Sequence, residues 1–136
     1  SLYVAEMIKY DFGGVEFDFV VSAPPRKKKR SEDSFDHAAC LAKETALRIG
    51  VPFKARVLYQ KERLKKQSEL KPDERFKNVS GKFGVRNPDT VRGKTILVVD
   101  DVHTTGATIE ECASELLKAG AYRVYGATAA TTVKAD

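Results

Sequence analysis

The sequence has no long apolar run, few cysteines and no tryptophan. Its 136 residues include two cysteines, and no apolar stretch approaches the roughly 20 residues that a membrane-spanning helix needs. The N-terminal SLYVAEMIKY is too short and too polar to be expected to act as a signal peptide. These absences argue against a membrane protein and against a secreted disulfide scaffold, so we expect a cytoplasmic protein.

The two cysteines, Cys40 and Cys112, are far apart in the sequence. Neither has a second cysteine or a histidine at the spacing of a metal site. We therefore expect two buried, small and apolar side chains in a reducing compartment, with no disulfide and no zinc module.

The positive charge of the chain is concentrated in one place. Lysine and arginine number 24 against 19 aspartates and glutamates, which gives a net charge of +5. The run from Arg26 to Arg30 supplies five basic residues, so the rest of the chain is balanced. The run is either a solvated patch or a spot that meets phosphate.

The chain pattern predicts one α/β domain over residues 1–136, with a doubly wound and mainly parallel sheet. Hydrophobic and charged fractions of 42% and 32% are typical of a soluble globular domain. Apolar stretches predict strands at residues 17–22, 57–59, around 83, 95–99 and 124–128. Helical periodicity and stop signals predict helices at residues 2–10, at 34–49 with Asp33 or Ser34 as N-cap and Gly50 as terminator, and from about 109 to Gly120.

Residues 60–80, QKERLKKQSELKPDERFKNVS, are polar almost throughout. One interpretation is a solvated helix followed by a loop. The other is a functional lid, because long polar excursions within compact domains are often functional.

The stretch TILVVDDVHTTGATI, residues 95–109, carries the chemistry. An apolar strand ends in Asp100 and Asp101, and a new helix follows a loop rich in hydroxyl groups. The helix N-terminus offers unpaired N–H groups to a phosphate, and Gly106 allows the backbone to approach it closely. No lysine is present in this loop, which excludes a P-loop of the G-x-x-x-x-G-K-[ST] type.

Two carboxylates beside a phosphate site would repel the phosphate, so they are expected to face vicinal hydroxyls or a divalent cation. A ribose 5-phosphate has both a phosphate and a diol. Two alternatives were weighed: the magnesium pocket of a receiver domain, and a strand-to-helix turn that Asp and Thr merely cap. The acidic pair lies too late in the chain for the first, and a cap needs far fewer such residues than residues 100–108 contain.

The motif ILVVDDVHTTGAT resembles the phosphoribosyl pyrophosphate (PRPP) motif of type I phosphoribosyltransferases. Residues 30–52 and 65–85 resemble the competence-protein ComF branch of that family, and the resemblance covers about residues 17–129. It implies Mg²⁺-dependent transfer of a phosphoribosyl group from PRPP to a nitrogen acceptor, with release of pyrophosphate. It also implies a homodimer.

The resemblance assigns roles residue by residue. It implies that Asp100 and Asp101 bind the ribose hydroxyls and hold Mg²⁺ through those hydroxyls or through water. Basic side chains of the lid, Arg63, Lys65 or Lys66, would stabilise the leaving group. The remaining implied contacts are Thr104, Thr105, Gly106, Ala107 and Thr108 for the 5′-phosphate, and Ala23, Pro24, Pro25 and Arg26 for pyrophosphate.

The sequence also departs from the family pattern. Thr104 stands where purine-salvage members carry an aspartate, which argues against a purine acceptor. Residues 1–16 and the tail from Ala130 are all that is available for a base-binding hood, so we expect a minimal hood or none. Two alternative functions stay open: a PRPP or nucleotide sensor, and a single-stranded DNA accessory protein that uses the basic run and the lid.

Overall fold

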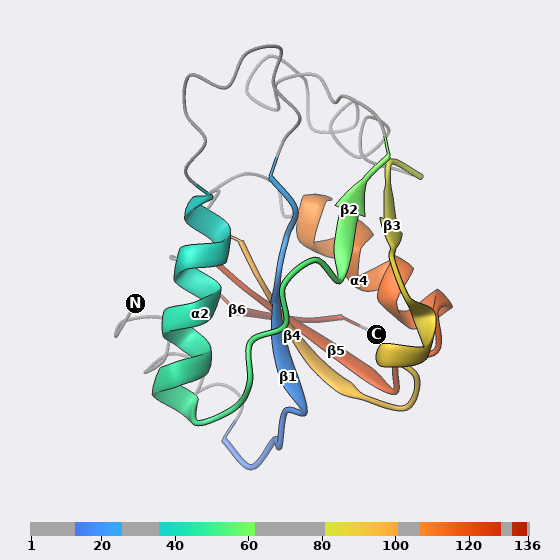
Figure 1. Ribbon diagram of the computed structural model, residues 1–136. Coiled ribbons are helices and arrows are strands. Elements are labelled where there is room, and N and C mark those ends of the chain that lie inside the picture. The colour runs from blue at the N-terminus through green and yellow to red at the C-terminus, as the bar shows by residue number, and fades with distance from the viewer. Residues whose placement is uncertain (1–12, 26–35, 62–80, 101–106, 129–131, 136) are drawn as a thin grey trace.

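A four-stranded sheet forms the centre of the computed structural model (Figure 1). The structure describes residues 13–25, 36–61, 81–100, 107–128 and 132–135. The order of the sheet is β1 (Phe19–Ser22), β4 (Thr95–Val99), β5 (Arg123–Ala127) and β6 (Thr132–Ala135). The first three strands are parallel and β6 runs antiparallel to β5. The predicted doubly wound and mainly parallel sheet is confirmed.

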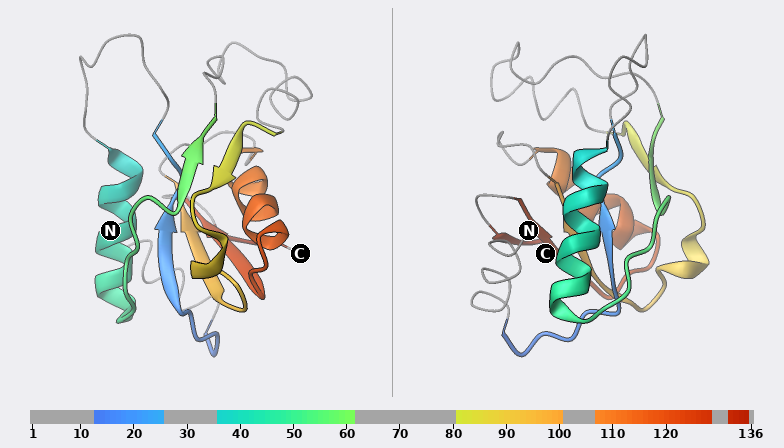
Figure 2. Two further views of the ribbon diagram at one scale, coloured as in Figure 1. Left: turned by 45° about the vertical axis from the view of Figure 1, so that its right-hand side comes forward. Right: turned by 60° about the vertical axis from the view of Figure 1, so that its left-hand side comes forward.

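Two helices cover opposite faces of this sheet. Helix α2 (His37–Ile49) packs against β1 and β4, whereas α4 (Ala107–Lys118) packs against β4 and β5. The left view of Figure 2 shows the sheet between the two helices. Cover on both faces explains why β4 is apolar from Ile96 to Val99.

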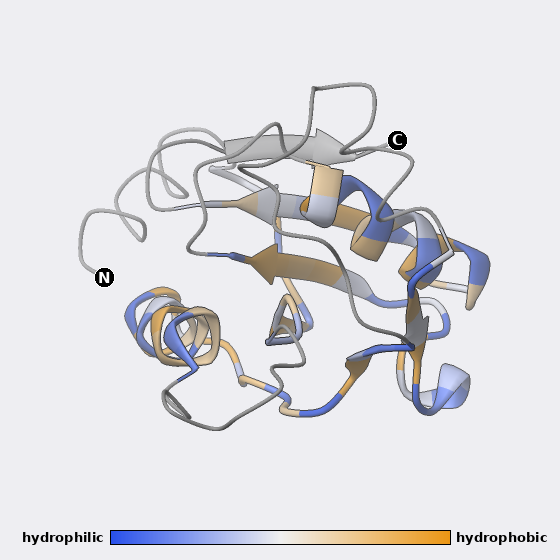
Figure 3. Cartoon of the chain, turned by 90° about the horizontal axis from the view of Figure 1, so that it is seen from above, coloured by the Kyte–Doolittle hydropathy of each residue, from blue (hydrophilic) through white to orange (hydrophobic). Residues whose placement is uncertain are grey.

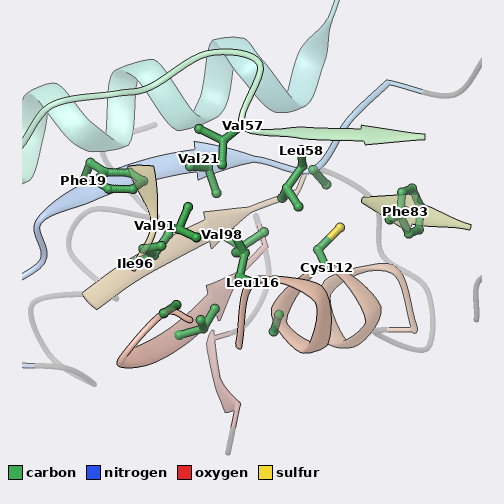
Figure 4. Packing of buried hydrophobic residues seen from close by; sticks show 14 of the residues in the cluster. Phe19, Val21, Val57, Leu58, Phe83, Val91, Ile96, Val98, Cys112 and Leu116 are labelled. Carbon is green, nitrogen blue, oxygen red and sulfur yellow. The ribbon is translucent and has the colours of Figure 1, made fainter. Parts of the chain in front are cut away.

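Alternate residues of β4 enter two separate hydrophobic clusters. Ile96 and Val98 pack on the α4 side with Leu116, whereas Leu97 and Val99 pack on the α2 side. All four β4 residues are fully buried. The hydrophobic colouring in Figure 3 is strongest on the central strands, and Figure 4 shows the α4-side cluster at close range.

A separate two-stranded ribbon lies over α4. Strand β2 (Leu58–Gln60) pairs antiparallel with β3 (Phe83–Val85), and Leu58 and Phe83 point into the α4-side cluster (Figure 4). The N–H of Lys61 donates a hydrogen bond to the carbonyl of Lys82. The sequence predicted both strands but not that they form a ribbon of their own. A short 3₁₀ turn, η2 (Pro88–Thr90), then leads towards β4.

The chain after α2 lies along the outer side of β1. The N–H of Val20 donates to the carbonyl of Pro52 at 2.8 Å, and the N–H of Lys54 donates to the carbonyl of Val20 at 2.9 Å. Phe53 forms a parallel bridge with Val20. The chain therefore moves outward from β1 through α2, and in the opposite direction, from β4 to β5, through α4.

The N-terminus of α2 corrects one prediction. Asp36 is the N-cap, and its side chain accepts a hydrogen bond from the N–H of Ala39 at 2.9 Å. The proposed caps Asp33 and Ser34 lie outside the described residues, as does the predicted helix at residues 2–10. The other end agrees with the prediction, because Gly50 ends the helix with a φ of 77°.

One further prediction was wrong in part. Cys112 is buried as expected, but Cys40 is exposed, because it lies on the side of α2 away from the buried Ala38, Ala42 and Ala46. Residues 132–135 of the tail, where the sequence predicted no strand, form β6 and belong to the sheet. Within the described ranges, no helix is long and apolar enough to cross a membrane.

Candidate functional site

The three parallel strands end together at one edge of the sheet. Ala23, Asp100 and Thr128 are the residues that follow β1, β4 and β5. The N–H of Ala23 donates to the carbonyl of Val99 at 3.0 Å, and the N–H of Asp100 donates to the carbonyl of Ala127 at 3.0 Å. These two bonds extend the strand pairing by one residue and fix the backbone at the start of each loop.

The strand order reverses direction at this edge. From β1 the chain goes outward to Phe53, whereas from β4 it goes the other way to β5. The next element after β1 is α2 and the next element after β4 is α4, and these two helices cover opposite faces of the sheet (Figure 1). Open α/β sheets bind their ligands at such a switch point, beyond the carboxyl ends of the strands.

Asp100 occupies the middle of this edge. It is only 7% exposed, although it carries a carboxylate. Its charge acts on Cys112 in α4: burial raises the pKa of the Cys112 thiol well above its ordinary value, and the nearby carboxylate of Asp100 raises it further. The charge of Asp100 therefore acts on a residue in the first half of α4.

The first turn of α4 provides the other described part of the motif. Ala107 begins the helix and is buried in the α4-side cluster, and Thr108 follows it with a partly buried side chain. The N–H groups of a helix's first turn have no partners within the helix and favour an anion. The other predicted residues of this stretch, Asp101, Thr104, Thr105 and Gly106, lie outside the described residues.

The predicted pyrophosphate loop is described over three residues. Ala23 is fully buried and contributes its backbone to the strand end, Pro24 is partly buried, and Pro25 is exposed. Arg26 lies outside the described residues. The side chain of Ala23 therefore packs in the core, and only its backbone is left to contact a ligand at the edge.

The strands that flank the proposed lid are β2 before it and β3 after it. The end of β2 and the start of β3 lie at the same end of the molecule (Figure 1). The base of the proposed lid is fixed to α4, because the N–H of Gly81 donates to a carboxylate oxygen of Glu111 at 3.0 Å. Arg63 and Lys65 lie outside the described residues, so their roles stay predictions.

Thr128 is a residue of the edge that the sequence reasoning did not single out. It follows β5, is 7% exposed and lies in line with Ala23 and Asp100. The signal was available, since Thr128 is the first hydroxyl after the apolar part of the strand VYGA. The sequence predicts Thr128 only as the last residue of a strand at residues 124–128.

Asp100 is the one residue of the predicted Mg²⁺ site that lies within the described residues. No group of three metal-ligating side chains occurs within the described ranges. Mg²⁺ commonly uses one or two carboxylates, several waters and the phosphates of a substrate. Asp100 fits that pattern, in which the protein holds the ion through water or through ligand hydroxyls.

The comparisons with known proteins agree with this geometry. The model of the phosphoribosyl transferase domain matches residues 36–134, from the cap of α2 to β6. The chain belongs to the phosphoribosyl transferase domain family. The match confirms the family that the motif at residues 95–109 indicated.

Among curated proteins, the chain is similar to the DNA utilization protein YhgH of Salmonella typhi, with 29% identity over 107 residues. The Salmonella typhimurium protein of the same name matches equally well. The match covers 79% of this chain and 46% of the relative, so the chain spans about half the length of the curated relatives it matches. This similarity agrees with the resemblance to the ComF branch.

Several solved structures share the fold. The glutamine PRPP amidotransferase of B. subtilis, complexed with ADP and GMP, aligns over 93% of this chain and 25% of its own length, with a TM-score of 0.59 and 23% identity. A purine phosphoribosyltransferase of Pyrococcus horikoshii aligns over 93% of this chain and 67% of its own, with a TM-score of 0.53 and 18% identity. At these identities the similarity establishes the fold alone.

Proposed function

We propose that the carboxyl edge binds PRPP, or another ligand with a ribose 5-phosphate, with the help of Mg²⁺. The protein then transfers the phosphoribosyl group to a nitrogen acceptor and releases pyrophosphate. The observation that carries the proposal is the placement of Asp100: a nearly buried carboxylate directly after β4, at the switch point between β1 and β4. The family membership supports it.

In this proposal, different described residues bind different parts of the ligand. The carboxylate of Asp100 accepts hydrogen bonds from a ribose hydroxyl, while the first turn of α4 from Ala107 receives the 5′-phosphate. Because the two groups lie at opposite ends of one loop, residues 100–107, they bind opposite ends of one sugar. Thr128 follows the neighbouring strand and can donate its hydroxyl to the same ligand.

The reaction breaks the bond between C1′ and the pyrophosphate oxygen and forms a bond from C1′ to the acceptor nitrogen, which gives up a proton. Mg²⁺, when bound, neutralises charge on the pyrophosphate. Negative charge grows on the leaving group, so fixed donors at the edge stabilise the transition state. Arg26 of the first loop and Arg63 or Lys65 of the lid are the residues we propose for that role.

The first test is a calorimetric titration of PRPP with and without Mg²⁺. We expect Mg²⁺-dependent binding, and we expect Asp100→Asn, alone or with Asp101→Asn, to abolish it or weaken it by at least tenfold. The exposed Asp89, which pairs with Arg92 far from this edge, supplies the matched control Asp89→Asn. Equal binding by the Asp100 variant and the control would overturn the placement of the site.

A second candidate is a PRPP sensor that binds without transfer. It is favoured by β6, because residues 132–135 are committed to the sheet and not to an acceptor-binding hood. One assay distinguishes the two functions: the release of pyrophosphate in the presence of nitrogenous acceptors. Release above the rate without acceptor supports transfer, and bound but unchanged PRPP supports sensing. For either function we propose a cytoplasmic location, on the ground of the two free cysteines.

A further inference from the structure

The ribbon of β2 and β3 ends in three residues, here called the ribbon end: Lys61, Gly81 and Lys82. The N–H of Lys61 donates to the carbonyl of Lys82 at 2.6 Å, one residue beyond the paired Gln60 and Phe83. Lys61 and Gly81 are exposed, whereas Gln60 and Phe83 are buried. Packing therefore holds the two strands as far as Gln60 and Phe83, and the ribbon end extends past that packing.

A hydrogen bond connects the ribbon end to α4. The N–H of Gly81 donates to a carboxylate oxygen of Glu111 at 3.0 Å, across 30 positions of the sequence. A carboxylate acceptor makes such a bond stronger than a neutral acceptor does. Glu111 is the fifth residue of α4 and lies about one turn after Ala107, with which the helix begins. The bond therefore links the ribbon end to the start of α4.

Gly81 is needed for its backbone conformation. Its φ of 71° lies in the left-handed region that favours glycine. A Cβ at this position would meet nothing within 4 Å, so the glycine does not serve to make space for a neighbour. The sequence thus places a glycine where the chain turns into β3, and the N–H of that turn is the one that donates to Glu111.

The ribbon end lies at the end of the molecule that holds the carboxyl edge. Strands β1 and β2 run towards the same end (Figure 1, Figure 2). Arg63 and Lys65 follow Lys61 by two and four residues. An extended chain covers at most about 3.6 Å per residue, so Arg63 can be no farther than about 7 Å from Lys61. The position of the ribbon end therefore limits where these two basic residues can act.

We propose that Glu111 is a positioning residue for the recognition of pyrophosphate. By fixing the ribbon end, it keeps Arg63 and Lys65 within reach of the pyrophosphate group of PRPP, and it does not contact the ligand itself. The inference rests on the proposed function, which assigns those two residues to the leaving group. It makes the preference of the site for PRPP over ribose 5-phosphate depend on a side chain of α4.

The test compares calorimetric titrations of PRPP and of ribose 5-phosphate, both with Mg²⁺. Ribose 5-phosphate lacks the pyrophosphate, so the preference for PRPP, the ratio of the two affinities, measures pyrophosphate recognition. We expect Glu111→Ala to reduce this preference about tenfold and to leave the affinity for ribose 5-phosphate within about twofold of the wild type. Glu111→Gln keeps an acceptor oxygen for the Gly81 N–H and should retain most of the preference. A general loss of structure would instead weaken the binding of both ligands.

Glu110→Ala is the matched control, because Glu110 is exposed, neighbours Glu111 and carries the same charge. It should leave the preference for PRPP unchanged. Circular dichroism and urea unfolding verify that each variant is folded. An equal preference in Glu111→Ala and Glu110→Ala would overturn the inference and leave the proposed function intact. Failure of the wild-type chain to bind either ligand would overturn both.

A double-mutant cycle tests whether Glu111 acts through the two basic residues. In an Arg63→Gln, Lys65→Gln background, Glu111→Ala should have no further effect on the preference for PRPP, because the side chains that it positions are already lost. An undiminished effect in that background would show that Glu111 acts by another route and would overturn the inference. A wild-type chain that binds PRPP and ribose 5-phosphate equally well would do the same.

Discussion

The ring of Tyr59 occupies the space that a side chain on Gly84 would need. The two residues are directly opposite in the β2–β3 ribbon, and a Cβ on Gly84 would approach the ring to 2.7 Å. Gly84 has no left-handed φ, so its backbone accepts alanine. The glycine is needed for the space that it leaves to the ring.

A double-mutant cycle tests this relationship. Gly84→Ala should destabilise the wild-type chain by about 1 kcal/mol or more, because overpacking forces the ring away. In a Tyr59→Ala background the same change should be neutral or stabilising, since alanine suits a strand interior better than glycine. Urea unfolding of the four proteins measures the coupling. Equal effects of Gly84→Ala in both backgrounds would contradict the contact.

The α4-side cluster depends on Leu116. This side chain is fully buried between the sheet and α4, so Leu116→Ala should lower the free energy of unfolding by about 2–5 kcal/mol. Leu47 of α2 is 80% exposed, and Leu47→Ala should change it by about 0.5 kcal/mol or less. Chemical denaturation compares the two variants, and comparable losses would show that the packing of α4 is misassigned.

The N-cap of α2 depends on a single side-chain oxygen of Asp36. Asp36→Ala removes the acceptor of the Ala39 N–H and should cost about 1 kcal/mol of unfolding free energy. Asp36→Asn keeps an acceptor oxygen and should cost a few tenths at most. Thermal unfolding of both variants decides the point. A loss from Asp36→Asn as large as that from Asp36→Ala would mean that charge, and not the hydrogen bond, matters.

Cys112 makes stability depend on pH in alkaline solution. Burial and the neighbouring Asp100 raise the pKa of its thiol in the folded chain. The unfolded thiol loses its proton above about pH 8.5 while the folded thiol keeps it, so stability is full below that pH and falls as pH rises. Between about pH 7.5 and pH 9.5 the wild type should lose on the order of 1 kcal/mol more than Cys112→Ala does.

The Cys112→Ala comparison cancels the titration of lysines and tyrosines, which the two proteins share. The measurement is urea unfolding at both pH values. Cys40→Ala serves as the second control, because Cys40 is exposed and should leave the wild-type pH dependence unchanged. Parallel pH curves for the wild type and Cys112→Ala would show that the thiol is not buried beside Asp100.

The parallel centre of the fold could be predicted from the sequence. The four apolar residues of β4 and the helical stripe of α4 are continuous signals, and burial on both faces produces them directly. Strands β2 and β3 are only three residues long and their partners are 20 or more residues apart, so no local pattern shows that they pair with each other. The tail TTVKA has no apolar run, because an edge strand needs none, and β6 was missed.

The candidate site was predictable to the same extent. Asp100 was placed correctly because a carboxylate directly after a buried strand must lie at the carboxyl edge. Thr128 was missed because a threonine suits a strand as well as a site. The cap was misplaced by two or three residues because Asp33, Ser34 and Asp36 are all good caps, and only the hydrogen bond to Ala39 decides among them.

The contact between Val20 and residues 52–54 has a consequence for association. An exposed strand edge is a template for pairing with other chains, and it is a common starting point of aggregation. Here both hydrogen-bonding groups of Val20 are taken by Pro52 and Lys54, and proline has no N–H to offer a further strand. The segment after α2 thus closes one side of the parallel core, and β6 closes the other.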